Sequence, residues 1–369
     1  EKNQIKTLIK SQKSNHSLDQ LFYVNDLIFK LDLENFFFKQ WIFVGHVSRI
    51  PNIGDYFLLN VRNESIIIIR DFNNIIHAHY NVCRHRGSRI CLKDEGSKKL
   101  LVCPYHAWSY NIDGTLKSAR LMNSNFNKRD WDLHGCNIKV YEGLIFINFS
   151  NEPVSFDEFI EPNKPYIELH GLKDAKIAYR KIYPTYGNWK LTLDNFHECY
   201  HCQPSHPEYC SVHDPEYILA YGGGSGTGPH SEKFSRRLAE WNEKTKKLGY
   251  LTGEYSERNF NNFSRGAERT PLSEGTLSET KSGKPACKKL MGKFKEHDHG
   301  YTGIGPSPFN SLMMCNDFAT LFTFLPKSPL QTDVEIMWLV HKDAEEGKDY
   351  NLKDIIWLWD KTTIADKRI

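Results

Sequence analysis

The chain has 369 residues, of which 40% are hydrophobic and 25% are charged, and its formal net charge is +3. This composition is typical of a globular protein, and so small a net charge without a block of Lys and Arg argues against nucleic-acid binding. No apolar run approaches the roughly 18 residues that cross a bilayer, so no membrane segment is expected.

Nine cysteines in a chain of this length favour a reducing, cytoplasmic location over a disulfide-stabilised scaffold. The first 17 residues are polar and contain no apolar segment of a secretory signal. Because the sequence starts with Glu1 rather than Met, we expect that a few residues precede it in the natural protein.

Apolar positions with helical spacing over residues 18–40 predict an N-terminal helical segment, which we assign to residues 1–40. From Trp41 the apolar period changes to two, which predicts strands at residues 41–47, 56–61, 65–70, 75–80 and 144–149. Residues 116–129 are expected to form a loop. Residues 41–150 are therefore predicted to be a small, all-β domain.

Residues 151–369 mix both kinds of element, after a proline-containing linker expected at residues 151–165. Strands are predicted at residues 177–183, 311–315, 320–325 and 334–340. Helices are predicted at residues 188–203 and 231–248 and from about Leu352 onward. Long loops are expected at the glycine-rich residues 221–229 and at residues 249–300. This order predicts an α+β domain with an antiparallel sheet.

Two short motifs in the β domain each offer one cysteine and one histidine. Cys-Arg-His at residues 83–85 is separated by seventeen residues from Cys-Pro-Tyr-His at residues 103–106. A Rieske [2Fe–2S] centre needs this mixture because one iron binds two thiolates and the other binds two imidazoles. Structural zinc sites usually pair like with like, which makes zinc the weaker alternative. The predicted cluster ligands are Cys83, His85, Cys103 and His106.

The remaining cysteines are expected to be packing residues and not metal ligands. They are Cys91, Cys136, Cys199, Cys202, Cys210, Cys287 and Cys315.

A second metal site is expected in the sequence Glu-Cys-Tyr-His-Cys-Gln-Pro-Ser-His at residues 198–206. On one straight helix Glu198 and His201 would share a face, whereas His201 and His206 would lie about 140° apart. Pro204 would end or kink the helix and could bring His206 back towards His201.

Two histidines and one carboxylate form the facial triad of non-haem Fe(II) oxygenases. The carboxylate must come from elsewhere in the fold, with Asp366 as the first candidate and Asp360 as the second. A His pair with this spacing is weak evidence alone. The Rieske motif strengthens it, because a cluster that stores one electron at a time needs an acceptor.

These motifs resemble those of the catalytic α subunits of Rieske-type non-haem iron oxygenases. The two cluster loops match at residues 81–87 and 103–108, and the iron-binding helix matches at residues 195–206. The resemblance covers nearly the whole chain and implies a Rieske domain inserted in a helix-grip catalytic domain, usually assembled as a homotrimer. Asp366 falls where the third iron ligand belongs, and a further C-terminal helix is expected beyond Ile369.

In such trimers a carboxylate on the iron helix bridges the iron of one subunit and the cluster of its neighbour. Ring-hydroxylating members usually have Asp there, whereas this chain has Glu198. The longer residue is similar to the branch that acts on quaternary ammonium compounds such as glycine betaine, stachydrine and carnitine. Residues 269–275 and 338–344 also resemble that branch.

The resemblance implies an O₂-dependent monooxygenase that hydroxylates an N-methyl group of a small quaternary ammonium compound, giving formaldehyde and the demethylated amine. Electrons would come from NAD(P)H through a separate flavin and iron–sulfur reductase, because the chain has no dinucleotide fingerprint. Two alternatives remain, an aromatic-ring-hydroxylating dioxygenase and a Rieske electron carrier without oxygenase activity.

Aromatic faces hold trimethylammonium groups well, which makes four phenylalanines candidates for a substrate pocket. Burial in the sheet core is the simpler interpretation for any one of them. The four are Phe309, Phe318, Phe322 and Phe324.

Overall fold

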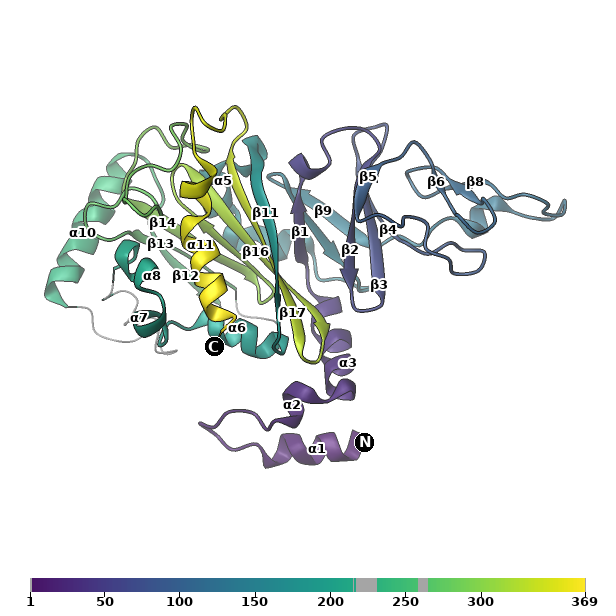
Figure 1. Cartoon of the computed structure of the whole chain (residues 1–369), viewed down its shortest axis with the longest axis horizontal. Coiled ribbons are helices and arrows are strands. Elements are labelled where there is room, and N and C mark those ends of the chain that lie inside the picture. Colours follow the sequence, from purple (N-terminus) through teal and green to yellow (C-terminus); the bar gives the residue numbers. More distant parts are fainter. Residues whose placement is uncertain (1, 215, 217–230, 258–264, 369) are drawn as a thin grey trace.

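The computed structural model describes residues 2–214, 216, 231–257 and 265–368. A narrow β-rich lobe extends from one side of a larger body of sheet and helices, and the N-terminal helices lie below their junction (Figure 1). The loop expected at residues 221–229 lies outside the described residues. Among the described helices, none has the length and apolarity needed to cross a membrane.

The N-terminal segment is helical, as expected, and its elements are α1 (Lys2–Ser11), α2 (Leu21–Val24), α3 (Asp26–Asn35) and η1 (Phe37–Lys39). The Asn25 side chain caps α3 by accepting from the amides of Leu27 and Ile28, at 2.9 and 3.0 Å. A capping oxygen satisfies amides that have no partner inside the helix. The helix then buries Phe29 and Leu33 in the main core.

The lobe consists of three small antiparallel sheets, in the orders β1-β10-β9, β4-β3-β2-β5 and β6-β7-β8. The strands are β1 (Ile42–His46), β2 (Asp55–Val61), β3 (Glu64–Arg70), β4 (Ile76–Tyr80), β5 (Glu95–Ser97), β6 (Leu101–Val102), β7 (Ser109–Tyr110), β8 (Leu116–Ser118), β9 (Asn137–Tyr141) and β10 (Leu144–Asn148). Two short 3₁₀ helices, η2 (Val47–Arg49) and η3 (Lys128–Trp131), complete the lobe.

Two local predictions for the lobe were wrong. Residues 116–129 are not one loop, because they contain β8 and the start of η3. The strand β9 was missed, and its exposed positions explain why: only Ile138 and Tyr141 are even half-buried, so the strand has no apolar alternation.

The body is built on a seven-stranded antiparallel sheet in the order β11-β17-β16-β15-β14-β13-β12. Its strands are β11 (Ala175–Thr185), β12 (Gly253–Glu257), β13 (Arg265–Pro271), β14 (Gly300–Ser307), β15 (Asn310–Met314), β16 (Phe318–Ser328) and β17 (Gln331–His341). The α+β class is thereby confirmed. The prediction of loops over residues 249–300 was wrong in part, because β12 and β13 lie there.

The helices of the body are α4 (Phe156–Ile160), η4 (Glu161–Asn163), α5 (Lys164–His170), η5 (Leu172–Asp174), α6 (Trp189–His197), α7 (Cys202–Ser205), α8 (Pro207–Val212), α10 (Glu232–Lys247) and α11 (Leu352–Asp366). The linker expected at residues 151–165 is therefore largely helical. Pro162 and Pro165 each lie in the first turn of a helix, where proline is tolerated because that amide needs no intrahelical partner.

The two faces of the sheet are covered differently. Side chains alternate along β16, so that Phe322 joins the core that contains Leu358 and Trp359 of α11, whereas Leu321 joins a second core with α4 and α5. Figure 1 shows α6 and α11 lying along the sheet on one side. This helix-covered face positions the second candidate site.

The lobe is fastened to the body by buried polar contacts. The Asn310 side chain accepts from the Phe43 amide at 2.9 Å and donates to the Phe43 carbonyl at 3.0 Å. His46 on β1 donates from Nε2 to the Leu172 carbonyl at 2.9 Å. Arg49 lies 3.7 Å from Glu335 of β17. Since these groups are buried, the contacts hold the two parts in one arrangement.

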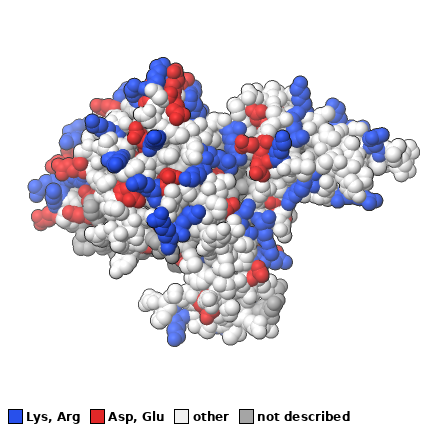
Figure 2. Space-filling view, in the orientation of Figure 1, with Lys and Arg blue, Asp and Glu red and all other residues white. Residues whose placement is uncertain are grey.

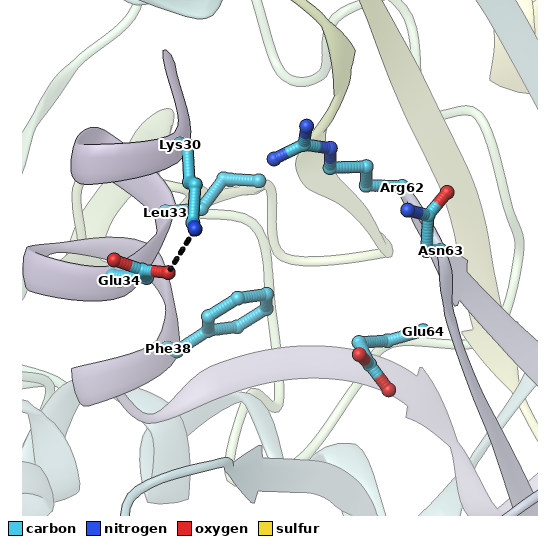
Figure 3. Close-up of a pocket in the computed structure, with 7 residues that line it drawn as sticks. All are labelled: Lys30, Leu33, Glu34, Phe38, Arg62, Asn63 and Glu64. Carbon is cyan, nitrogen blue, oxygen red and sulfur yellow. Dashed lines mark ion pairs between the residues drawn. The ribbon is translucent and has the colours of Figure 1, made fainter. Parts of the chain in front are cut away.

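Charge is mixed over the surface seen in Figure 2, where acidic and basic side chains alternate across the body. A small cavity of about 150 Å³ opens between α3 and the turn that joins β2 and β3. Figure 3 shows Lys30 and Glu34 facing Arg62 and Glu64 across it. Charges of both signs line this cavity, and none of the predicted metal ligands does.

Candidate metal centres

The two Cys/His loops lie next to each other and share one backbone design. In each loop the cysteine carbonyl accepts from the amide four residues later, Gly87 at 2.9 Å and Ala107 at 3.1 Å. Each cysteine amide donates to the carbonyl five residues later, at 2.8 Å. Gly87 and Ala107 both have positive φ, of 73° and 58°. Glycine adopts this conformation freely, whereas Ala107 adopts it at a cost, so the second turn is held in place by its surroundings.

The side chains of these loops separate into buried thiols and accessible imidazoles. Cys83 and Cys103 are each 2% exposed, whereas His106 is exposed and His85 is half-buried. The two imidazole rings lie 4.6 Å apart. Two inner thiols and two outer imidazoles provide the donor set that would hold a Rieske cluster.

Tyr110, which sequence reasoning missed, supports the first loop from β7. Its hydroxyl lies 3.3 Å from the Cys83 sulfur and accepts from the Arg84 amide at 3.1 Å. Burial raises the pKa of the Tyr110 hydroxyl, so this group keeps its proton and can donate to a thiolate. Hydrogen bonds to the cysteine sulfurs are one of the features that set the reduction potential of an iron–sulfur cluster.

Aromatic rings hold the two imidazoles. Trp108 is buried and stacks on His85 with centroids 4.9 Å apart and planes within 8°. Tyr105 lies on His106 at 3.7 Å and is 60% exposed. The first imidazole is therefore backed by the core, and the second lies at the surface.

The helix that was predicted to carry the second site ends earlier than expected. α6 stops at His197, and Glu198 is extended with φ −119° and ψ 157°. Pro204 lies inside the separate short helix α7 and does not cause the break. The Glu198 carboxylate accepts from the Tyr200 amide at 2.5 Å, and side chains that bind nearby backbone in this way compete with helix formation. The prediction of one helix over residues 188–203 was therefore wrong.

The predicted triad nevertheless comes together. His201, His206 and Asp366 each place one potential ligand atom within 4.8 Å of the other two. The Asp366 oxygen lies 2.8 Å from Nε2 of His206 and 3.5 Å from Nε2 of His201. His201 precedes α7, His206 follows it, and Asp366 ends α11. Elsewhere on α11, Asp360 accepts from Lys181 and Tyr183 of β11, so the second candidate carboxylate is engaged away from the triad.

Carboxylates and an amide surround the triad. Glu198 lies 2.5 Å from Nδ1 of His201, which leaves Nε2 of that ring directed at the triad. The amide nitrogen of Asn195 lies 3.3 Å from the same Nε2. Nδ1 of His206 is buried without a hydrogen-bond partner, and the nearest carboxylate oxygen, from Glu208, is 3.9 Å away. Metal-bound histidines usually donate their other nitrogen to a carboxylate, and His201 meets this pattern through Glu198 whereas His206 does not. Two histidines and one carboxylate are the donor set that fits a mononuclear iron.

A buried carboxylate that sequence reasoning missed joins the ligand-bearing helices. Glu279 has no exposed surface, and its two oxygens lie 2.8 Å from Nε2 of His213 and 3.0 Å from Nε1 of Trp359. His213 directly follows α8, which begins just after His206, and Trp359 lies two turns before Asp366 on α11. The contact is non-local, so no pattern along the sequence could have indicated it.

The four candidate pocket phenylalanines are each exposed by 1% or less. Phe322 and Phe324 pack on Phe196 of α6, with centroids 4.9 and 5.0 Å apart. Phe309 packs instead on Phe37 and Trp189. The structure therefore shows these rings as core, and a role in substrate binding stays a prediction.

Two cysteines beside the triad are not simple packing residues. Cys199 and Cys202 form a disulfide with Cα atoms 4.9 Å apart, which corrects the expectation for this pair. The other seven cysteines are free.

Comparison with known families matches both parts of the chain. Residues 40–141 match the Rieske [2Fe-2S] domain, and residues 172–366 match the ring hydroxylating alpha subunit (catalytic domain). The glycine betaine monooxygenase oxygenase subunit of Pseudomonas aeruginosa is 34% identical over 98% of this chain and 82% of its own length. The chain belongs to the Rieske oxygenase α subunits.

Other members of this family are similar over shorter stretches or in fold. The carnitine monooxygenase oxygenase subunit of Acinetobacter pittii is 35% identical over 52% of each chain. The solved structure of a quaternary ammonium Rieske monooxygenase is 24% identical, with a TM-score of 0.69 over 94% of this chain and 82% of that one. Naphthalene 1,2-dioxygenase of a Rhodococcus species has a TM-score of 0.67 at 20% identity, over 99% of this chain and 80% of that one.

Membership in this family establishes the class of chemistry. The chain is an oxidoreductase that uses a Rieske cluster, a mononuclear non-haem iron and O₂. The alternative of a Rieske electron carrier was wrong, because residues 172–366 form the catalytic domain of an oxygenase. As an oxygenase subunit, the chain works with a reductase.

Proposed function

We propose that this chain is the oxygenase subunit of a monooxygenase that demethylates a small quaternary ammonium compound of the glycine betaine kind. The observation that carries this proposal is the 34% identity to a glycine betaine monooxygenase oxygenase subunit along almost the whole chain. The glutamate in contact with His201 agrees with it, because the aspartate usual in ring-hydroxylating members is replaced by Glu198.

The donor sets assign the ligands in this proposal. Cys83, Cys103, His85 and His106 hold the cluster, and His201, His206 and Asp366 hold the iron. When bound, the cluster supplies electrons one at a time and the iron supplies the activation of O₂. The product of N-methyl hydroxylation is a hemiaminal, which releases formaldehyde and leaves the demethylated amine.

The protein groups around the triad orient the reacting centre. Glu198 holds His201 by Nδ1 and so fixes which nitrogen faces the iron. Asn195 can donate a hydrogen bond at the triad, on the side of His201 Nε2. Glu279 keeps α8 and α11 in register, which holds His206 and Asp366 at a fixed separation.

The two metal sites of one chain are far apart in the folded molecule. The cluster loops lie in the lobe next to β6, whereas the triad lies beside α7 and the end of α11 on the other side of the body (Figure 1). Side chains at both places are accessible, with Tyr105 60% exposed and Tyr200 85% exposed. We infer that the active unit is a homotrimer in which the cluster of one chain faces Glu198 of the next.

The partners follow from the same proposal. A flavin and iron–sulfur reductase takes electrons from NAD(P)H and delivers them to the cluster. A cytoplasmic location agrees with the seven free cysteines.

Product analysis tests this function. The full chain, loaded with iron and cluster and supplied with a reductase and NADH, is incubated with glycine betaine under air. We expect one formaldehyde and one dimethylglycine for each O₂ consumed, and a His206→Ala variant should give neither. Diol formation from an aromatic acid, without formaldehyde from any betaine, would instead support the ring-hydroxylating alternative.

A further inference from the structure

The loop that carries His201 is closed by the Cys199–Cys202 disulfide. The two cysteines lie on either side of the ligand, in the order Cys199-Tyr200-His201-Cys202. Cys202 is 6% exposed, whereas Cys199 is half-buried and the intervening Tyr200 is 85% exposed. In the proposed trimer this side faces the next chain, so a dithiol partner approaches the bond from the side of Cys199 only while the chain is unassembled.

Backbone hydrogen bonds connect the two disulfide-bonded cysteines to His206. The Cys202 amide donates to the Cys199 carbonyl at 3.1 Å, and the His206 amide donates to the Cys202 carbonyl at 2.8 Å. The Ser205 amide donates to the His201 carbonyl at 3.0 Å. A change in the freedom of Cys202 is thus transmitted to the backbone of both histidines.

This pair is the one bonded couple among the cysteines that the structure describes. Cys210 on α8 is the nearby free thiol, and its sulfur lies 3.7 Å from the Cys202 carbonyl oxygen. The cluster loops contain no comparable bond, since Cys83 and Cys103 are free to bind metal. A redox change at the pair should therefore affect the iron site and not the cluster.

We propose that Cys199 and Cys202 form a reversible thiol–disulfide switch that sets how firmly the chain holds its mononuclear iron. This inference rests on the proposed function in taking His201 as an iron ligand. With the bond closed, the loop between α6 and α7 is restrained and His201 stays directed at His206 and Asp366. With the bond open, the loop loses its covalent restraint and keeps the contacts of His201 with Glu198, Asn195 and Asp366 and the backbone hydrogen bonds, so His201 swings away more readily.

Closing and opening of the disulfide are both balanced redox reactions with known reagents. Closing consumes one hydrogen peroxide: the two thiols lose two electrons and two protons, and two water molecules form. Opening uses a dithiol of the thioredoxin class. Its thiolate attacks the Cys199 sulfur, Cys202 leaves as the thiolate and is protonated, and the second thiol of the partner resolves the mixed disulfide. Two thiols are regenerated and the partner is oxidised.

The first measurement is a count of free thiols in the full protein with cluster and iron bound. The protein is diluted until the assembly dissociates, and alkylation followed by peptide mass spectrometry is done after peroxide and after a thioredoxin-class dithiol. We expect the peptide with Cys199 and Cys202 to be unlabelled after peroxide and doubly labelled after reduction. Full labelling in both states would overturn the proposal.

The second measurement is the rate at which a chelator of both ferrous and ferric iron removes the mononuclear iron, because peroxide also oxidises Fe(II). We expect roughly tenfold faster loss from the reduced protein than from the oxidised protein, the size of effect that outer contacts of metal ligands usually have. The double variant Cys199→Ser/Cys202→Ser should lose iron at the fast rate in both states. The matched control Cys210→Ser should behave like the unaltered chain.

Equal rates in both redox states would overturn the switch while leaving the iron site intact. Failure of either state to bind a third iron would instead contradict the proposed function. Cluster absorbance, followed in the same samples, is expected to stay constant throughout.

Discussion

The two candidate metal centres are built in opposite ways. The cluster ligands come from two loops separated by seventeen residues, and both loops use the same backbone hydrogen bonds around the cysteine. The triad takes its ligands from a broken helical segment and from the end of α11, 160 residues later. Local backbone geometry fixes the first site, whereas tertiary packing and carboxylate side chains fix the second.

This difference determines which substitutions should disturb each metal site. A substitution far along the chain should disturb the iron site, because Glu279 and α11 contribute to it from a distance. The cluster site should respond mainly to changes within its own lobe. Four substitutions and one pH dependence test this contrast, in order of decreasing expected effect.

Asp366→Ala should abolish iron binding at the triad and leave the cluster site intact. We expect oxygenase activity to disappear and the iron content to fall from three to two atoms per chain, because two histidines alone bind Fe(II) poorly. Iron analysis and cluster spectroscopy on the same sample measure this. Asp360→Ala is the matched control and should retain three irons. A third iron kept at full occupancy in Asp366→Ala would show that the ligand is misassigned.

Glu198→Gln should leave both sites loaded but uncouple them. The amide keeps the size of the side chain but removes the charge that holds His201 and, in the proposed trimer, bridges to the neighbouring cluster. We expect turnover to fall about 100-fold, while the reductase still reduces the cluster at the normal rate. Single-turnover rapid mixing distinguishes the two steps. Glu240→Gln, at an exposed position of α10, provides the control, and normal turnover in Glu198→Gln would contradict the bridging role.

Glu279→Ala tests control of the iron site from a distance. Removing this buried carboxylate leaves His213 and Trp359 without a shared partner, so α8 and α11 lose their common support. We expect mononuclear iron affinity to fall 10- to 100-fold with the cluster unchanged. Glu279→Gln should recover part of the affinity, because it can still accept from Trp359. Equal affinity in all three proteins would show that the contact has no role in the iron site.

Acid should destabilise the fold in part through the junction of the two parts. Burial lowers the pKa of His46 from 6.5 to about 4, despite the hydrogen bond to the Leu172 carbonyl. The unfolded chain therefore binds a proton between these values that the folded chain does not, and stability falls as the pH drops from about 6.5 to 4. The loss approaches about 3 kcal/mol for this residue. His46→Gln, which cannot titrate, should flatten the dependence of the unfolding temperature on pH in that window. An unchanged pH profile would rule out His46 as its source.

Tyr110→Phe should have the smallest effect and should be confined to the cluster. It removes one hydrogen bond to the Cys83 sulfur and leaves the ring in place. Because such bonds stabilise the more negative, reduced cluster, we expect the reduction potential to fall and iron content to stay at three. A redox titration followed by circular dichroism measures the shift. A potential equal to that of the unaltered chain would show that the bond is absent when the cluster is bound.

The same contrast explains how much could be predicted from sequence. The cluster loops were recognisable because two Cys/His pairs supply the donor set of a Rieske centre. The triad was recognisable only because that motif strengthened a His pair that is weak evidence alone. The backbone between Glu198 and His206 was predicted wrongly. The Glu198 side chain binds the Tyr200 amide where α6 ends, and helical periodicity in the sequence does not indicate such a contact. Tyr110 and Glu279 act through contacts between distant segments, so no local pattern marked them.

The paired hydrogen bonds between Asn310 and the backbone of Phe43 have a consequence for how the enzyme responds to concentration. They join the lobe to the body as backbone hydrogen bonds join neighbouring strands of a sheet, and the lobe cannot rotate about this contact. A single chain therefore cannot fold its cluster over onto its own iron. Dilution that dissociates the assembly should stop turnover while every metal remains in place, and the specific activity should rise again when the protein is concentrated.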